Sequence, residues 1–181
     1  MDDTGDSAGR VVVGFDGSDD AATAVRYAVA EAARRGLAVR VVVAHDPPDA
    51  WMADYGMPLL ADDGGIRQAV EDTARVRVEE IRAGTSAAHR AVPVEVVAVT
   101  GPAVAVLTQE ARDAAHLVVG HRGRGGLRSA LLGSVGLGVV LHAPCPVTVV
   151  PPARRTAPRA PGRGSEADAA LAGPLPIGPV A

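Results

Sequence analysis

Five short valine-rich runs recur along the chain, and segments with a different hydrophobic period separate them. Because the runs are continuous rather than alternating, they are typical of strands buried on both faces of a parallel sheet. They occupy residues 11–15, 39–44, 93–99, 116–119 and 147–150. Apolar residues between them recur at helical spacing and predict helices at about 21–35, 66–83, 102–113 and 134–141. Strands that alternate with helices require right-handed crossovers, so the pattern predicts an α/β fold with a five-stranded parallel sheet.

Capping residues and apolar faces add detail to the predicted helices. The turn at 16–20 supplies several N-cap candidates for the first helix, and Gly36 is its expected C-cap. Pro102 is expected in the first turn of the third helix, a position that proline favours. The residues of the second helix that are expected to face the core are Ile66, Ala69, Val70, Thr73 and Ile81.

The composition divides the chain into a folded centre and two polar ends. Residues 1–9 are small and acidic, and we expect a disordered leader there. Residues 152–181 are rich in proline, alanine and arginine, and we expect a disordered tail. Residues 10–151 form the predicted domain. Within it, residues 45–65 interrupt the periodic pattern with prolines and aspartates, which indicates a long loop over one end of the sheet.

Composition also excludes several kinds of chemistry. All 18 basic residues are arginine, so the chain has neither a Schiff-base lysine nor the lysine of a Walker A loop. The single cysteine, Cys145, permits no intrachain disulfide and is expected to be a packed small residue. A net charge of −3 does not favour a nucleic-acid partner. No apolar run is long enough to cross a membrane, and the first residues lack the order of a secretion signal. We therefore expect a cytoplasmic protein that binds neither nucleic acid nor membranes.

The stretch from Val118 to Ser134 combines a strand, a glycine-rich loop and a helix start. Gly120 and Gly123 follow the strand, and Gly133 directly precedes Ser134. Glycine permits positive φ and lets the backbone approach a ligand closely, while free N–H groups at a helix start favour a phosphate. Ser134 is expected to cap the helix and to offer its hydroxyl to a phosphate oxygen. A glycine-rich surface turn that binds nothing is the alternative.

The spacing Gly-x2-Gly-x9-Gly-Ser in this stretch resembles the nucleotide-binding signature of the universal stress protein family. The opening VVVGFDGSDDAATAVRYA is similar to the family's first strand and helix, and HAPCPVTVVP is similar to its last turn and strand. This resemblance covers residues 10–151. It implies a Rossmann-like sheet, related to the adenine nucleotide alpha-hydrolase-like fold, with strand order 3-2-1-4-5. Strands one and four would then be neighbours, so Asp16 and Gly120 would face one crevice.

The same resemblance implies a nucleotide site and a part for each residue in it. Asp16 is expected toward the ribose with Gly14 beside it, and the backbone of Ala44 is expected against adenine. Three residues are expected to line the ribose and phosphates: Val119, Gly120 and Gly123. Three more are expected to bind phosphate through N–H groups and a hydroxyl: Gly133, Ser134 and Val135. Arg122 adds positive charge beside the phosphates, and a solvent-exposed loop arginine is the alternative for it.

Three functions are open at this stage. The resemblance favours an ATP-binding stress-response or regulatory module that carries Mg²⁺ or Mn²⁺ on the phosphates and dimerises through its last strand, 147–150. A slow ATPase or nucleotidyl-transfer enzyme is the second. No catalytic residue is assigned, because the chain lacks an attacking residue, a lysine and a clear base, and it has FDGSDD where related ATP pyrophosphatases have Ser-Gly-Gly-x-Asp-Ser. No protein metal ligand is assigned, because the aspartates between 46 and 63 do not have the spacing of a calcium loop. The third is a stress dimer that binds no nucleotide, a subclass that lacks the glycine signature present here.

Overall fold

A computed structural model describes residues 9–46, 64–123 and 132–152 of the chain. Within these residues, five strands form one parallel sheet in the order β3-β2-β1-β4-β5, which confirms the predicted fold class and strand order. The strands are β1 (Arg10–Gly14), β2 (Val39–His45), β3 (Val94–Thr100), β4 (Ala114–Gly120) and β5 (Val147–Val150). Residues 1–8 of the predicted leader, 47–63 of the predicted loop and 153–181 of the predicted tail lie outside the described residues.

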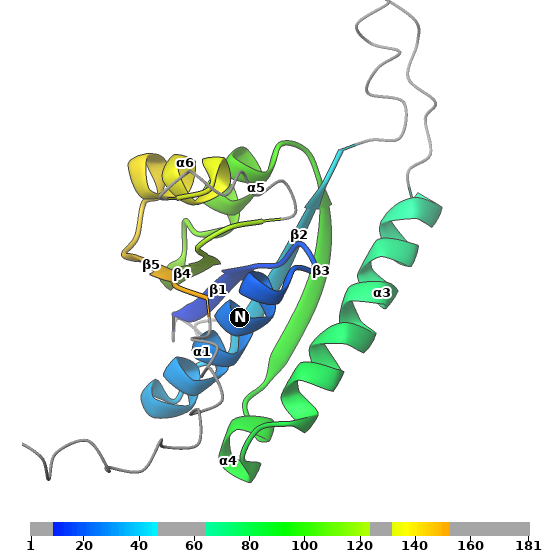
Figure 1. Cartoon of the computed structure of the whole chain (residues 1–181), viewed down its shortest axis with the longest axis vertical. Helices are drawn as coiled ribbons and strands as arrows, with labels where there is room; N and C mark the ends of the chain where they lie inside the picture. The colour runs from blue at the N-terminus through cyan, green and yellow to red at the C-terminus, as the bar shows by residue number, and fades with distance from the viewer. Residues whose placement is uncertain (1–8, 47–63, 124–131, 153–181) are drawn as a thin grey trace, which may run out of the picture.

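Helices cover both faces of the sheet (Figure 1). On one face lie α1 (Asp19–Arg35), α3 (Gly64–Ala83) and α4 (Ala87–Arg90), and on the other lie α5 (Ala103–Glu110) and α6 (Ser134–His142). The sequence pattern did not predict α4, because four residues are too few to show a helical period. In the part of the chain described here, no helix combines the length and apolar character needed to cross a membrane.

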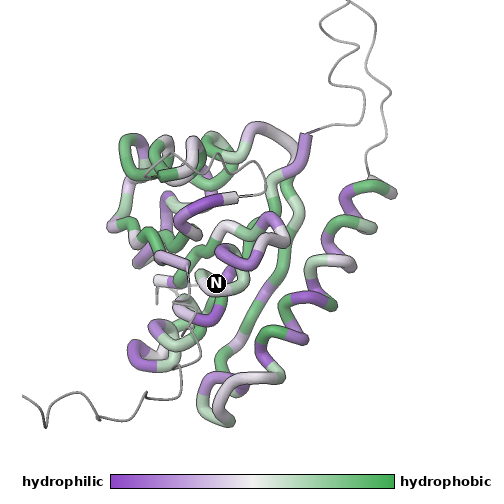
Figure 2. Tube along the Cα trace, viewed as in Figure 1, coloured by the Kyte–Doolittle hydropathy of each residue, from purple (hydrophilic) through white to green (hydrophobic). Residues whose placement is uncertain are grey.

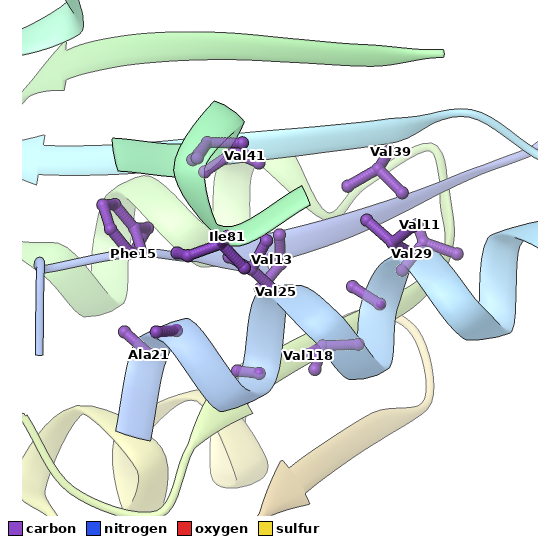
Figure 3. Packing of buried hydrophobic residues seen from close by; sticks show 14 of the residues in the cluster. Val11, Val13, Phe15, Ala21, Val25, Val29, Val39, Val41, Ile81 and Val118 are labelled. Atoms are coloured by element: carbon purple, nitrogen blue, oxygen red, sulfur yellow. The ribbon is translucent and has the colours of Figure 1, made fainter. Parts of the chain in front are cut away.

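Side chains of β1 alternate between two hydrophobic cores. Val11 and Val13 pack with Val25 of α1 in the first core (Figure 3), whereas Val12 packs with Leu117 in the second, under α5 and α6. All five side chains are fully buried, and burying one contributes about 1.5–3 kcal/mol. The strands are mostly hydrophobic along their length, while α3 alternates hydrophobic and hydrophilic positions (Figure 2). Continuous valine runs were therefore reliable markers of strands with two covered faces.

Helix α1 has a capping group at each end. Ser18 is its N-cap, and the Ser18 hydroxyl accepts a hydrogen bond of 3.2 Å from the N–H of Ala21. Gly36 ends the helix in the left-handed conformation with φ of 68°, as the predicted C-cap should. Asp19 and Asp20 in the first turn complement the helix dipole. The start of α1, which lies over the carboxyl ends of β1 and β4, is thus fixed in place.

The predicted inward face of α3 was partly wrong. Ile81 is buried as expected, but Ile66, Ala69 and Thr73 are exposed, and Ala74 and Val78 are the other buried residues of the helix. The first turns of α3 extend away from the sheet (Figure 1), so their apolar side chains have no strand to cover. Periodicity gave the helix correctly, but it could not show which turns reach the sheet.

Helices α5 and α6 pack closely on each other. A Cβ atom added at Gly138 of α6 would lie 2.6 Å from Cγ2 of Val104 in α5, closer than real Cβ atoms approach other atoms. The missing side chain therefore allows the two helices to touch directly. Together they form the layer that covers the second core.

Gly120 allows the end of β4 to meet the start of α1. A Cβ atom at this position would lie 2.8 Å from the carbonyl carbon of Asp20 and 2.9 Å from its oxygen. Both atoms belong to the backbone of a capped helix, so they cannot move aside as a flexible side chain would. Gly120 is needed for this contact whatever else the loop after β4 does.

We expect Gly120→Ala to lower the free energy of unfolding by about 1–3 kcal/mol, because the added methyl group forces β4 and α1 apart. Urea denaturation followed by circular dichroism measures this change. Gly65→Ala, in the first turn of α3, is the control, since a Cβ atom there meets nothing within 4 Å. Equal stability of Gly120→Ala and the parent would contradict the contact.

Candidate functional site

A cavity of about 430 Å³ opens at the carboxyl ends of β1, β2 and β4. It lies where the strand order reverses between β1 and β4, the usual place for a ligand in an open α/β sheet. All ten residues predicted from the sequence line this one cavity: Gly14, Asp16, Ala44, Val119, Gly120, Arg122, Gly123, Gly133, Ser134 and Val135. Its volume is within the range of small-molecule sites. Parallel pairing brings these residues together although more than 100 positions separate the first from the last.

One end of the cavity has aliphatic walls. Val42 and Ala44 of β2, Val119 of β4 and Leu107 of α5 line it and belong to the second core. Gly14 at the end of β1 adds no side chain, and a Cβ atom there would lie 3.0 Å from a methyl carbon of Leu107. The result is a slot suited to a flat apolar group.

Six of the lining residues were not predicted as site residues: Phe15, Ala21, Val42, Ala103, Leu107 and Gly136. Ala103 and Leu107 come from α5, which crosses over β2 to reach the cavity. The periodic pattern placed Leu107 inward, but it gave no sign that the inward side met a cavity. Only the packing of the helix on the sheet shows this.

The other end of the cavity is formed by the start of α6. Ser134, Val135 and Gly136 occupy the first turn, and their N–H groups have no acceptor within the helix. Gly133 is the N-cap and provides no side-chain hydrogen bond, and the first turn has no acidic residue. The predicted capping role of Ser134 was therefore wrong, since Ser134 is already inside the helix. This turn presents an uncompensated positive dipole end to the cavity.

The glycines of the signature, Gly120, Gly123 and Gly133, do not have positive φ. Among the described residues, positive φ occurs only at Gly17, Gly36 and Gly101, so the expected use of this conformation by the signature was wrong. The glycines instead leave space: a Cβ atom at Gly123 would lie 2.7 Å from Oδ2 of Asp16. At Gly133 the nearest atoms would be at 3.5 Å, an ordinary contact. No contact among the described residues therefore requires a glycine at position 133.

Asp16 makes a hydrogen bond within the turn after β1, and Asp20 connects the start of α1 to the loop after β4. Oδ1 of Asp16 accepts a hydrogen bond of 3.0 Å from the N–H of Ser18, and Oδ2 of Asp20 accepts one of 3.2 Å from the N–H of Arg122. The first bond orients the Asp16 carboxylate, which lines the cavity beside Gly123, and the second positions the backbone of Arg122, which also lines the cavity. The described lining of the cavity thus includes one acidic and one basic side chain.

Backbone hydrogen bonds connect the loop after β4 to the last strand. The N–H of Gly133 donates to the carbonyl of His121 over 3.0 Å, and the N–H of His121 donates to the carbonyl of Val150 over 2.9 Å. The Gly133 N–H was expected to bind phosphate, but in the structure it donates to the carbonyl of His121. The N–H groups of Ser134, Val135 and Gly136, in the first turn of α6, form the positive end of the helix dipole.

Other reactive side chains lie away from the cavity. Burial lowers the pKa of His116, and the positive charge of Arg35 lowers it further, while its Nε2 lies 2.6 Å from the hydroxyl oxygen of Thr148. Burial raises the pKa of the Cys145 thiol, an effect that the hydrogen bond with the Leu117 backbone partly offsets. A neutral thiol is a poor nucleophile, which fits the packing role expected for Cys145. In the described parts of the chain, no group of three or more His, Cys, Asp or Glu residues is arranged to hold a metal ion.

A wider hollow lies at the opposite end of the strands, beside the amino ends of β1, β2 and β3. It measures about 1200 Å³, and its charged lining residues are Arg10, Arg40, Glu95 and Asp113. None of the residues predicted for the site lines it. The first cavity is therefore where the predicted residues, the reversal of strand order and a helix start coincide.

Comparison with known proteins gives consistent matches. Residues 8–151 match the model of the universal stress protein family. The universal stress protein Rv1996 of Mycobacterium tuberculosis is 35% identical over 167 residues, which cover 83% of this chain and 51% of the relative. The chain thus spans about half the length of the curated relatives it matches.

Solved structures show the same fold. A universal stress protein crystallised in complex with cAMP is 26% identical, with a TM-score of 0.52, and the match covers 80% of this chain and 98% of that one. A universal stress protein from Archaeoglobus fulgidus in complex with dAMP is 22% identical, with a TM-score of 0.50, over 78% of this chain and 97% of that one. The sheet order, the family match over residues 8–151 and these relatives show that the chain belongs to the universal stress protein family.

Proposed function

We propose that this protein binds an adenine nucleotide, ATP in particular, and acts as a nucleotide-dependent regulatory module. The observation that carries the proposal is the continuity of one cavity from an aliphatic slot to an uncapped helix start. An adenine ring fits the first end, and an anion fits the second. The related structures that hold cAMP and dAMP support an adenine nucleotide.

The arrangement of the cavity orients the proposed ligand. The base lies against Val42, Ala44 and Leu107, and the ribose lies near the Asp16 carboxylate. The phosphates face the N–H groups and hydroxyl at the start of α6, with Arg122 supplying positive charge. Backbone donors at a helix start take the place of the lysine that the chain lacks.

We propose that Mg²⁺ or Mn²⁺ accompanies the phosphates. Arg122 is the only cationic side chain among the described residues that line the cavity, and one positive charge leaves most of a triphosphate's charge to be neutralised. Hard cations favour oxygen ligands, and the lining of the cavity offers the Asp16 carboxylate and the Ser134 hydroxyl. The phosphate oxygens would supply the remaining ligands.

Binding, rather than catalysis, is the proposed activity. Among the described residues that line the cavity there is no histidine, cysteine or lysine, and Asp16 carries the only carboxylate. An attacking group paired with a base, which covalent catalysis uses, is therefore not present on the described walls. Slow hydrolysis by bound water is compatible with this site.

The first prediction for this site uses the open space at Gly133. An aspartate there can cap α6 and accept hydrogen bonds from Val135 and Gly136, the same N–H groups that the phosphates would use. We expect Gly133→Asp to raise the free energy of unfolding by about 0.5 kcal/mol while lowering the affinity for Mg-ATP about tenfold or more. Calorimetric titration with Mg-ATP and urea denaturation measure the two opposite effects.

Two controls accompany this substitution. Gly65→Asp adds the same charge at the start of α3, outside the cavity, and should leave ATP affinity unchanged. Gly133→Ala separates the added side chain from the added charge. Unaltered ATP affinity in Gly133→Asp would place the phosphates elsewhere. A parent protein that binds no adenine nucleotide would contradict the proposed function and favour a stress dimer without nucleotide.

We further propose that the protein forms a homodimer through β5. This strand is at the edge of the sheet, and edge strands present unpaired backbone groups. Beside it, α6 exposes the large apolar residues Leu137, Val140 and Leu141. Residues 132–152 contain no aspartate, glutamate, lysine or arginine, so two copies can bring these surfaces together without charge repulsion.

The dimer proposal predicts a specific effect of Val149→Pro. The carbonyl of Pro146 accepts from Leu117 of β4, and that of Val150 accepts from His121, directly after β4. In a parallel ladder alternate residues face the same neighbour, so the Val149 N–H points outward. Proline there removes an outward donor and is tolerated at an edge. We expect dimer affinity to fall about tenfold or more with the monomer still folded, as measured by sedimentation. Val76→Glu on α3 is the control, and a monomeric parent would contradict the proposal.

A further inference from the structure

Arg40 connects two strands and a helix through its side chain. Its Nε donates a hydrogen bond of 2.7 Å to Oε2 of Glu110, the last residue of α5. Its Nη1 donates one of 2.6 Å to Oε2 of Glu95, the residue paired with Arg40 on β3. The side chains of Arg40 and Glu110 are 20% and 19% exposed, whereas that of Glu95 is 58% exposed. The bond to α5 is therefore the better shielded of the two.

The charges in this cluster depend on each other. Burial alone would lower the pKa of Arg40, but the hydrogen bonds and charges of Glu95 and Glu110 outweigh burial and raise it. Glu110 lies at the carboxyl end of α5, where the helix dipole disfavours a negative charge. The Arg40 guanidinium offsets this unfavourable effect and fixes the carboxyl end of α5 through a charge-assisted hydrogen bond to Glu110.

The cluster and the cavity occupy opposite ends of one strand–helix contact. Because side chains alternate along a strand, Arg40, Val42 and Ala44 lie on the same face of β2. Val42 and Ala44 line the aliphatic end of the cavity, and Ala103 and Leu107 of α5 line it from above the strand. The position of α5 along β2 therefore sets the width of the slot. At its other end, α5 begins at Pro102 without a side-chain cap.

We infer that Arg40 is a positioning residue for the aliphatic slot, acting through Glu110 to hold α5 where Leu107 and Ala103 form the wall against the base. Arg40 itself does not line the cavity. A binding slot tolerates displacements of only about 0.5 Å before its contacts loosen. The inference rests on the proposed function, since it assigns to Arg40 a part in the affinity for the nucleotide base.

The test compares two substitutions that each remove one carboxylate from the same arginine. Glu110→Ala removes the bond to α5 and leaves Arg40 paired with Glu95. Glu95→Ala removes the bond within the sheet and leaves α5 held. Titration with Mg-ATP reports base and phosphates together, while titration with inorganic tripolyphosphate reports the phosphate end alone. Circular dichroism and urea denaturation confirm that each variant is folded.

We expect Glu110→Ala to lower ATP affinity about fivefold and Glu95→Ala to leave it within about twofold of the parent. Tripolyphosphate affinity should stay the same in both variants, because the start of α6 is unchanged. Should Glu110→Ala not fold, Glu110→Gln keeps a hydrogen-bond acceptor and removes the charge, and it should give a smaller loss of the same kind.

Each other outcome has a distinct meaning. Equal ATP affinity in both variants and the parent would overturn the role of Arg40 while leaving ATP binding by the parent intact. Equal losses in Glu110→Ala and Glu95→Ala would also overturn it, because they would indicate a general effect of the ion pairs on stability. A parent that binds neither ATP nor tripolyphosphate would contradict the proposed function itself, and the inference with it.

Discussion

The structure depends on the burial of a valine-rich parallel sheet on both faces. A sheet with no polar face must have helices on each side, and here α1 and α3 cover one face and α5 and α6 the other. The helix that follows β1 lies on one face and the helix that follows β4 lies on the other, at the point where the strand order reverses. The cavity is a consequence of that reversal, because the connecting segments diverge there and leave the strand ends uncovered.

The two ends of the cavity follow from different parts of the chain. Some side chains of the second core also line the aliphatic slot, so the same packing that stabilises the domain forms the surface for an apolar ring. The polar end uses main-chain groups of α6, which need no particular side chain to attract an anion. A ligand that is apolar at one end and anionic at the other matches this division.

The sequence predicted the sheet because strands leave a local signal, whereas the ten lining residues were assigned from the resemblance of their motifs to the universal stress protein family. Valine runs indicate strands with two covered faces, and the spacing of Gly120, Gly123 and Gly133 indicates a loop between a strand and a helix. Tertiary contacts leave no such signal. Leu107 had the right period, yet its place in the cavity wall depends on where α5 lies over β2. Ile66 had the right period too, but it is exposed in the first turns of α3, which extend away from the sheet.

The direct contact between α5 and α6 has a consequence for local unfolding. Val104 occupies the space that a side chain at Gly138 would fill, so neither helix can separate from the other without exposing apolar surface on both. Elements that share such a contact open as one cooperative unit. Since α5 forms a wall of the slot and α6 forms the anion end, amide exchange in the two helices should respond together, and a ligand that protects one helix should protect both.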